Sequence, residues 1–122
     1  MSEIRSFKEL RVWQGAMSLV ESVYRLSIAF PAEENYGLKS QIRRAAVSIP
    51  SNIAEGHTRA STREYLNYLS IAQASLAEVE TQLEIAVRLR YLPAEQVNLA
   101  AADIQALGKQ LHALRKALET RK

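Results

Sequence analysis

The sequence predicts an all-α protein that folds as one up-and-down antiparallel four-helix bundle over residues 1–122. A chain of 122 residues is long enough to bury one core and too short for two. It contains only four Gly and three Pro, which disfavours an all-β fold built on many turns. Apolar residues also recur every three or four positions in four long segments, which is the spacing of helices.

The first helix is expected over about residues 7–29. Ser6 with Glu9 three positions later has the pattern of a capping box, and Phe30-Pro31 ends the segment because proline disfavours helical geometry in the residue before it. Apolar side chains between residues 11 and 26 cover roughly 180° of the helix surface, against ~100° for a typical surface helix. This apolar face comprises Val12, Trp13, Ala16, Met17, Leu19, Val20, Val23, Tyr24 and Leu26.

The second helix is expected over about residues 36–56, where apolar residues follow at intervals of three and four. Pro50 lies inside this segment and has no amide hydrogen for the carbonyl of Ala46. We therefore expect the helix to kink or restart at Pro50, with the Ser51 and Asn52 side chains near the freed carbonyls.

The third and fourth helices are expected over about residues 61–91 and 93–120. Ser61 and Glu64 form a second capping box before a long periodic run. Leu92-Pro93 breaks that run, and Pro93 suits the first turn of the next helix. Because all connections are short, each helix is expected to lie antiparallel to its neighbours.

The composition argues against several classes of protein. There is no cysteine, which excludes disulfides and thiolate metal sites and favours a reducing compartment, so we expect a cytoplasmic protein. No apolar run of 18 residues or more is present, so no membrane span is expected. His57 and His112 lack the partners of known metal motifs, and no Gly-rich phosphate loop or nucleophile motif occurs. We expect no enzyme, no cofactor, no metal and no small-molecule substrate.

Basic residues gather where the proposed topology brings four helix ends together. With helices one and three starting where helices two and four end, that end carries nine basic and five acidic residues, a balance of 9 − 5 = +4. Such a patch is typical of nucleic-acid binding, although cations also favour helix C-termini through the helix dipole. The candidate contacts are Arg5, Lys8, Arg11, Arg59, Arg63, Arg115 and Lys116.

The wide apolar face of the first helix exceeds what one core needs, so self-association is expected. A stripe of small residues on the back of the fourth helix favours the same conclusion, although alanine also serves helix propensity alone. The residues expected at the oligomer interface are Val12, Ala16, Leu19, Val23 and Leu26.

Polar residues on the second helix have two interpretations. They form a buried hydrogen-bonded network with the third helix, or they form an exposed recognition surface. The network is the favoured interpretation, because polar groups beside a proline can satisfy freed carbonyls. Its expected members are Arg44, Asn52, Glu55, Ser75 and Glu78.

The segment 41–56, QIRRAAVSIPSNIAEG, resembles the hallmark of the bacterial four-helix-bundle proteins encoded in intervening sequences of 23S ribosomal RNA genes, the S23 or IVP family. Phe7–Leu10 and Tyr65–Glu78 are similar to that family too. The resemblance implies a four-helix protomer and, from relatives of the fold, a ring-shaped homopentamer. It also implies a distant similarity to the RNA-associated accessory protein of diversity-generating retroelements.

Two functions are therefore expected to compete. The first is a non-catalytic homo-oligomer that binds RNA or another nucleic acid through its basic surface. The second is a structural module that assembles into a ring and docks a protein partner.

Overall fold

The computed structural model describes residues 6–120 of the chain. This part is all-helical and contains no strand, which confirms the predicted fold class. It consists of the short 3-10 helix η1 (Phe7–Glu9), α1 (Arg11–Ser27), the 3-10 helix η2 (Ala32–Glu34), α2 (Leu38–His57), α3 (Thr62–Arg88) and α4 (Ala94–Glu119).

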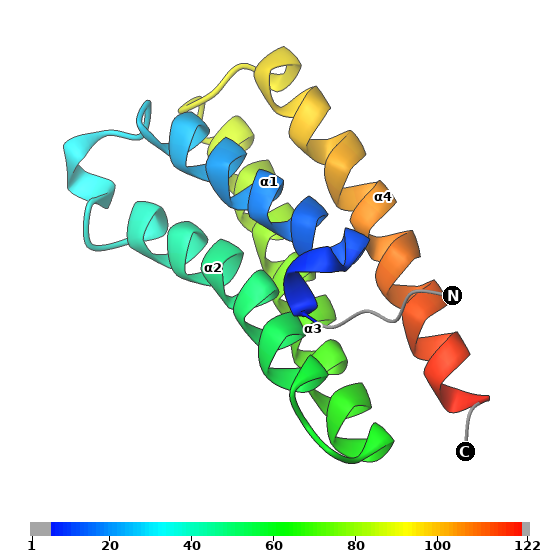
Figure 1. Cartoon of the computed structure of the whole chain (residues 1–122). Helices are drawn as coiled ribbons and strands as arrows, with labels where there is room; N and C mark the ends of the chain where they lie inside the picture. The colour runs from blue at the N-terminus through cyan, green and yellow to red at the C-terminus, as the bar shows by residue number, and fades with distance from the viewer. Residues whose placement is uncertain (1–5, 121–122) are drawn as a thin grey trace.

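The four α-helices pack in the order of the chain, each antiparallel to the helix before it, and α1 closes the bundle against α4 (Figure 1). One continuous apolar core lies between them. Every α-helix contributes side chains that are 2% exposed or less, among them Leu19, Ile42, Ile49, Ile53, Leu69, Leu83 and Leu111.

The start of the first helix differs from the prediction. The Ser6 hydroxyl accepts a hydrogen bond from the amide of Lys8, and this caps η1 rather than an α-helix. Leu10 then has an extended backbone, so α1 begins only at Arg11. A Cβ on Gly15 would lie 3.7 Å from Leu107 Cδ1. From that contact α1 begins four residues away and α4 ends twelve residues away, so α1 begins about 12 Å short of the end of α4. Figure 1 shows α4 extending beyond the start of α1.

Helix α2 runs through Pro50 without interruption, so the expected restart is wrong, whereas the expected kink stays a prediction. Pro50 is buried, and its missing amide hydrogen does not end the helix. The Asn52 side chain does reach a carbonyl, because its Nδ2 donates to the Ser48 oxygen at 2.8 Å, whereas Ser51 is exposed.

Close packing joins the end of α2 to the start of α3. A Cβ on Gly56 would lie 2.8 Å from Tyr68 Cβ and 3.0 Å from Tyr65 Cδ1, so only glycine fits there without a shift. The Ser61 hydroxyl accepts from the Glu64 amide at 3.1 Å, which confirms the second capping prediction.

The turn after α3 begins earlier than predicted, since the helix ends at Arg88. Arg90 has a φ of 65°, Tyr91 N donates to Ala86 O, and Arg90 N donates to Val87 O. This pattern is a Schellman motif, which closes a helix with one left-handed residue. Pro93 then lies at the N-cap of α4 rather than in its first turn.

Glu34 connects this turn to the start of α2. Its carboxylate accepts from the amide of Leu38 at 2.8 Å and from the Tyr91 hydroxyl at 2.8 Å. The Leu38 amide and then the Tyr91 hydroxyl lower the pKa of Glu34, and the same Glu34 contact raises the pKa of Tyr91.

Candidate nucleic-acid interface

The predicted basic residues lie on different elements of the bundle. Lys8 belongs to η1, Arg11 opens α1, Arg59 lies between α2 and α3, and Arg63 is in the first turn of α3. All four are exposed, as is Lys116 on α4, whereas Arg115 is half-buried. Arg5 lies outside the described residues.

Two of these cations meet in a hollow between the start of α3 and the end of α4. This end hollow, about 580 Å³, is lined by Arg63, Glu64, Asn67, Tyr68, Arg115 and Glu119, among others. Its two arginines and two glutamates balance, 2 − 2 = 0. A net positive potential at this end must therefore come from the cations around the hollow.

Arg59 is held over an aromatic ring at the rim of the end hollow. Its guanidinium carbon lies 4.8 Å from the centre of the Tyr68 ring, and its Nη2 donates to the Tyr68 hydroxyl at 2.6 Å. This positions a cation beside a ring, a pairing that single-stranded nucleic-acid sites use for phosphates and bases. Tyr68 was not among the predicted site residues. The sequence carries no local signal for it, because its contact with Arg59 joins residues nine positions apart across the turn between α2 and α3.

Arg115 has a structural contact as well. Its Nη1 donates to Gln73 Oε1 on α3, while its buried Nε has no hydrogen-bond partner within residues 6–120. The contact fixes the end of α4 against α3 and holds the guanidinium at the hollow.

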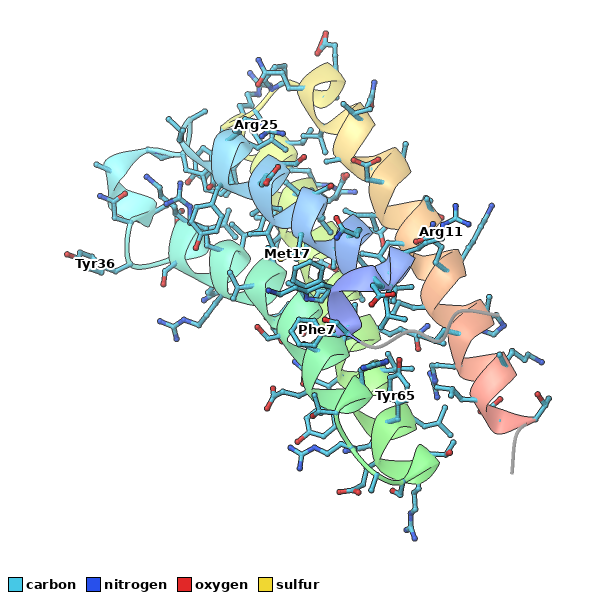
Figure 2. The ribbon with its side chains drawn as sticks, viewed as in Figure 1. Phe7, Arg11, Met17, Arg25, Tyr36 and Tyr65 are labelled. Carbon is cyan, nitrogen blue, oxygen red and sulfur yellow. The ribbon has the colours of Figure 1, made fainter. Side chains whose placement is uncertain are left out.

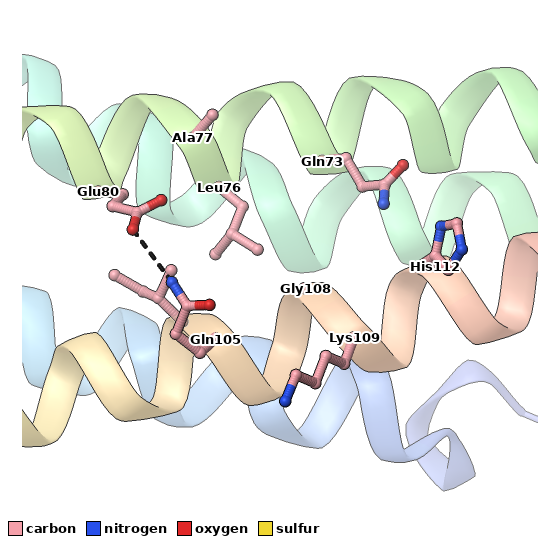
Figure 3. Close-up of a pocket in the computed structure, with 9 residues that line it drawn as sticks. Gln73, Leu76, Ala77, Glu80, Gln105, Gly108, Lys109 and His112 are labelled. Atoms are coloured by element: carbon pink, nitrogen blue, oxygen red, sulfur yellow. Dashed lines mark hydrogen bonds between the residues drawn. The ribbon is translucent and has the colours of Figure 1, made fainter.

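A groove lies between α3 and α4, and Figure 3 shows the side chains that line it. Gln105 Nε2 on α4 donates to Glu80 Oε2 on α3 at 3.2 Å, which bridges the groove. Lys109 and His112 line this part, so α4 carries basic groups from the groove to its end.

Lys8, Arg11 and Lys116 do not line the end hollow. For Lys8 and Arg11 the reason is the late start of α1, which places Arg11 beside α4 rather than at the tip of the bundle (Figure 2). The structure thus brings together Arg59, Arg63 and Arg115.

The predicted oligomer interface requires a correction. Val12, Ala16, Leu19 and Val23 are at most 5% exposed inside the protomer's own core, so they are not available to a second subunit. Leu26 is half-buried and packs on that core as well.

The exposed half of the wide apolar face lies elsewhere. A hollow of about 300 Å³ opens between the outer sides of α1 and α2, and its lining is almost wholly apolar. Met17 is 37% and Val47 41% exposed, and Figure 2 shows Met17 on this outer side. This apolar hollow is lined by Trp13, Met17, Val20, Val47, Pro50, Ser51 and Ala54.

The predicted polar network is smaller than expected. Asn52 Nδ2 donates to the Ser48 hydroxyl, and that hydroxyl lies 2.9 Å from the Ser75 hydroxyl on α3. Arg44, Glu55 and Glu78 are exposed and do not belong to it, because their positions on the helices face solvent. Their assignment to the network was wrong.

Neither a metal centre nor a membrane-spanning helix is found within residues 6–120. No group of three or more His, Cys, Asp and Glu side chains is placed to hold a metal ion there. None of the described helices has the length and apolar character needed to cross a membrane.

Comparison with known proteins gives a family and a fold. Residues 8–113 match the family model described as 23S rRNA-intervening sequence protein. A crystal structure of a protein of unknown function from the S23 ribosomal protein family of Bacteroides thetaiotaomicron matches with a TM-score of 0.79 and 25% identity. The match covers 86% of this chain and 98% of that one. No curated protein matches significantly.

Proposed function

The chain belongs to the 23S rRNA-intervening sequence protein family, and from this premise we propose that it is a non-catalytic, homo-oligomeric protein that binds RNA through its basic surface. The observation that carries the proposal is the cluster at the start of α3, where Arg59 lies over Tyr68 beside Arg63 and Arg115. A fixed cation beside an aromatic ring suits a single-stranded RNA, because phosphates and bases are both contacted.

The end hollow itself carries no net charge, so the exposed cations around it provide the long-range attraction. Lys8, Arg11, Arg59 and Lys116 are exposed and form no ion pair within residues 6–120. Such cations can contact RNA phosphates, and release the counterions of those phosphates, without first breaking an ion pair in the protein. The binding is expected to depend strongly on salt and weakly on base sequence.

Self-association is the second part of the proposal. The apolar hollow on α1 and α2 is the surface we assign to the contact between subunits, in place of the core residues of α1. The family resemblance implies five subunits. If they formed a ring, their formal charges would sum to 5 × 3 = +15, which favours multivalent binding of one RNA.

Fluorescence anisotropy of a labelled single-stranded RNA against salt concentration tests the RNA proposal. If about six phosphates are neutralised, log affinity falls with log salt at a slope of about −4. Replacing Lys8, Arg11, Arg59 and Arg63 with Gln should flatten this slope by about 3 units.

The matched control replaces three exposed cations at the opposite end of the bundle, Arg25, Arg88 and Arg90, with Gln. It is compared with a Lys8, Arg59 and Arg63 triple variant, which changes the net charge equally. A slope that falls equally in both variants, or no binding at low salt, refutes the proposed surface. An absence of binding at low salt favours the alternative function, a ring that docks a protein partner. The apolar hollow is the observation that supports this alternative.

A further inference from the structure

A second basic hollow lies at the other end of α2. It is formed by the last turns of α1, the η2–α2 turn and the first two turns of α2, and it measures about 580 Å³. No carboxylate lines it. Since α2 has 20 residues, its two ends are about 30 Å apart, so this hollow is separate from the end hollow. We call it the α2 hollow, and its lining includes Tyr24, Asn35, Lys39, Ser40, Arg43 and Arg44.

The positions of its cations are electrostatically unfavourable for the folded chain alone. The N-terminus of a helix carries partial positive charge, and acidic residues normally occupy its first turn. The first turn of α2 contains no acidic residue, and three cations follow within its first two turns. The nearby Glu34 carboxylate is already bound to the Leu38 amide and to Tyr91.

These cations have no protein counter-ion. The ion pair recorded within residues 6–120 joins Arg88 to Glu84 on α3, and none involves Lys39, Arg43 or Arg44. Lys39 and Arg43 are four positions apart, as are Ser40 and Arg44, so the four side chains share one side of the helix. Adjacent unpaired cations that repel one another favour a bound anion.

Arg43 is held in place for such an anion. Its Nε donates to the Ser27 hydroxyl at 2.8 Å, its Nη2 donates to the Tyr24 carbonyl at 3.2 Å, and its guanidinium lies 4.5 Å from the centre of the Tyr24 ring. Ser27 is fully buried and bonds the same carbonyl at 3.2 Å. Two of the five N–H groups of Arg43 are thus used, and three remain for a ligand. Because the side chain is already ordered, binding costs little conformational entropy.

We propose that the α2 hollow is a phosphate-binding site. A tetrahedral phosphate accepts several hydrogen bonds, and its negative charge would balance the three cations. The guanidinium of Arg43, with Lys39 and Arg44 beside it, can supply both the hydrogen bonds and the positive charge. The phosphate belongs either to an RNA backbone or to a small phosphorylated molecule. The proposal does not depend on RNA binding at the end hollow.

Titration with inorganic phosphate at constant ionic strength and pH tests the site. In NMR spectra of the labelled protein, the Arg43 Nε signal and the amides of residues 39–44 should shift and saturate. Arg44→Gln should weaken this binding about tenfold, because one charge-assisted contact is lost. Arg44 is exposed and makes no side-chain hydrogen bond or ion pair within residues 6–120, so the fold should be unaffected.

The matched control is Arg25→Gln, which removes one exposed cation from the last turns of α1. Arg25 does not line the α2 hollow. Without phosphate, Arg44→Gln should raise Tm by about 2 °C, because it removes one of the three cations that repel one another in the α2 hollow. Arg25→Gln should lower Tm, because it removes a cation from the last turn of α1. Equal loss of phosphate binding in both variants, or shifts that do not saturate, would overturn the proposal.

RNA-binding measurements on the same variant identify the source of the phosphate. If an RNA phosphate occupies the hollow, Arg44→Gln should make the salt slope of RNA binding about 0.7 units shallower. An unchanged slope together with saturable phosphate binding assigns the site to a small phosphorylated molecule. Phosphate binding by a protein that binds no RNA would refute the proposed function and leave this site standing.

Discussion

At the scale of single residues, Arg90 occupies a backbone conformation that glycine adopts more easily. It closes α3 with a φ of 65° in a Schellman motif. A non-glycine residue in the left-handed region costs about 1–2 kcal/mol, part of which is offset because glycine gains entropy in the unfolded chain. Within residues 6–120 the Arg90 side chain makes no hydrogen bond and no ion pair, so it does not offset this cost.

We predict that Arg90→Gly stabilises the protein by about 0.5–1 kcal/mol, which corresponds to a rise in Tm of about 2–4 °C. Thermal unfolding followed by circular dichroism measures this. The control is Arg88→Gly in the last turn of the helix, which should destabilise by about 1 kcal/mol. A loss of stability in both variants contradicts the prediction.

Glu34 and Tyr91 form a pH-dependent contact between η2 and the turn before α4. The pKa of Glu34 is lowered, so its contribution to stability is present above its unfolded pKa and is lost as pH falls through the folded pKa. The pKa of Tyr91 is raised, so its contribution is present below its unfolded pKa and is lost as pH rises through the folded one. The contact therefore persists across the neutral range.

We predict that Tyr91→Phe raises the pKa of Glu34 part of the way to its ordinary value, because the larger contribution, from the Leu38 amide, remains. Titration of the glutamate carboxyl carbons by NMR measures the shift. An identical Glu34 titration in the variant and the native protein shows that the tyrosine does not act on this carboxylate.

At the scale of the helices, the sequence pattern identified all four but not their exact starts. Capping and proline signals predicted α3 and α4 to within about three residues. The start of α1 could not be predicted in the same way, because Ser6 caps a 3-10 turn and a 3-10 turn satisfies the same capping pattern. Pro50 did not break α2, because the surrounding packing holds that buried segment in helical geometry.

The candidate sites were less predictable, since they depend on how helices face each other. The periodicity of α1 predicts a 180° apolar face, but the positions of α2 and α4 decide that Val12 and Leu19 enter the core while Met17 stays outside. Likewise, Ser48 meets Ser75 only because α2 and α3 are aligned along each other at one particular level. The periodic pattern of a single helix does not determine that alignment.

The packing of α2 on α3 gives a prediction at this scale. Gly56→Ala should destabilise the protein by about 2 kcal/mol, because the new methyl group would lie 2.8 Å from Tyr68 Cβ. Equilibrium unfolding in urea measures the change. The control is Gly108→Ala on α4, where the methyl group would have ordinary contact at 3.7 Å and should stabilise by up to about 1 kcal/mol. A neutral Gly56→Ala variant would show that the two helices separate at little cost.

At the scale of the whole molecule, the short connections correctly predicted how the helices alternate, but not that α1 is the shortest of the four. Four helix ends were expected at the basic end of the bundle. The end of α2, the start of α3 and the end of α4 reach the tip, whereas the start of α1 does not. The predicted patch is for that reason divided between the end hollow and the side of α4.

Self-association through the apolar hollow is tested by Val47→Lys. A lysine there would place a charge in the contact we propose, so the particle mass should fall towards the 13.7 kDa of one chain. Light scattering at micromolar concentration measures the mass. The control is Ile71→Lys on α3, where the original side chain has the same exposure, 41%, and the assembly should persist. Native protein at 13.7 kDa would exclude the oligomer.

Each helix packs on the helix that precedes it, and the contact of α1 with α4 is the one that joins distant parts of the chain. Folding therefore proceeds mostly through local contacts, and only the last closure orders a long loop. Helical bundles of this kind fold in microseconds to milliseconds. Two subunits at micromolar concentration meet productively only about once a second at ordinary association rates. A newly made subunit consequently completes its own core well before it encounters a partner, and its apolar hollow is presented on a folded surface.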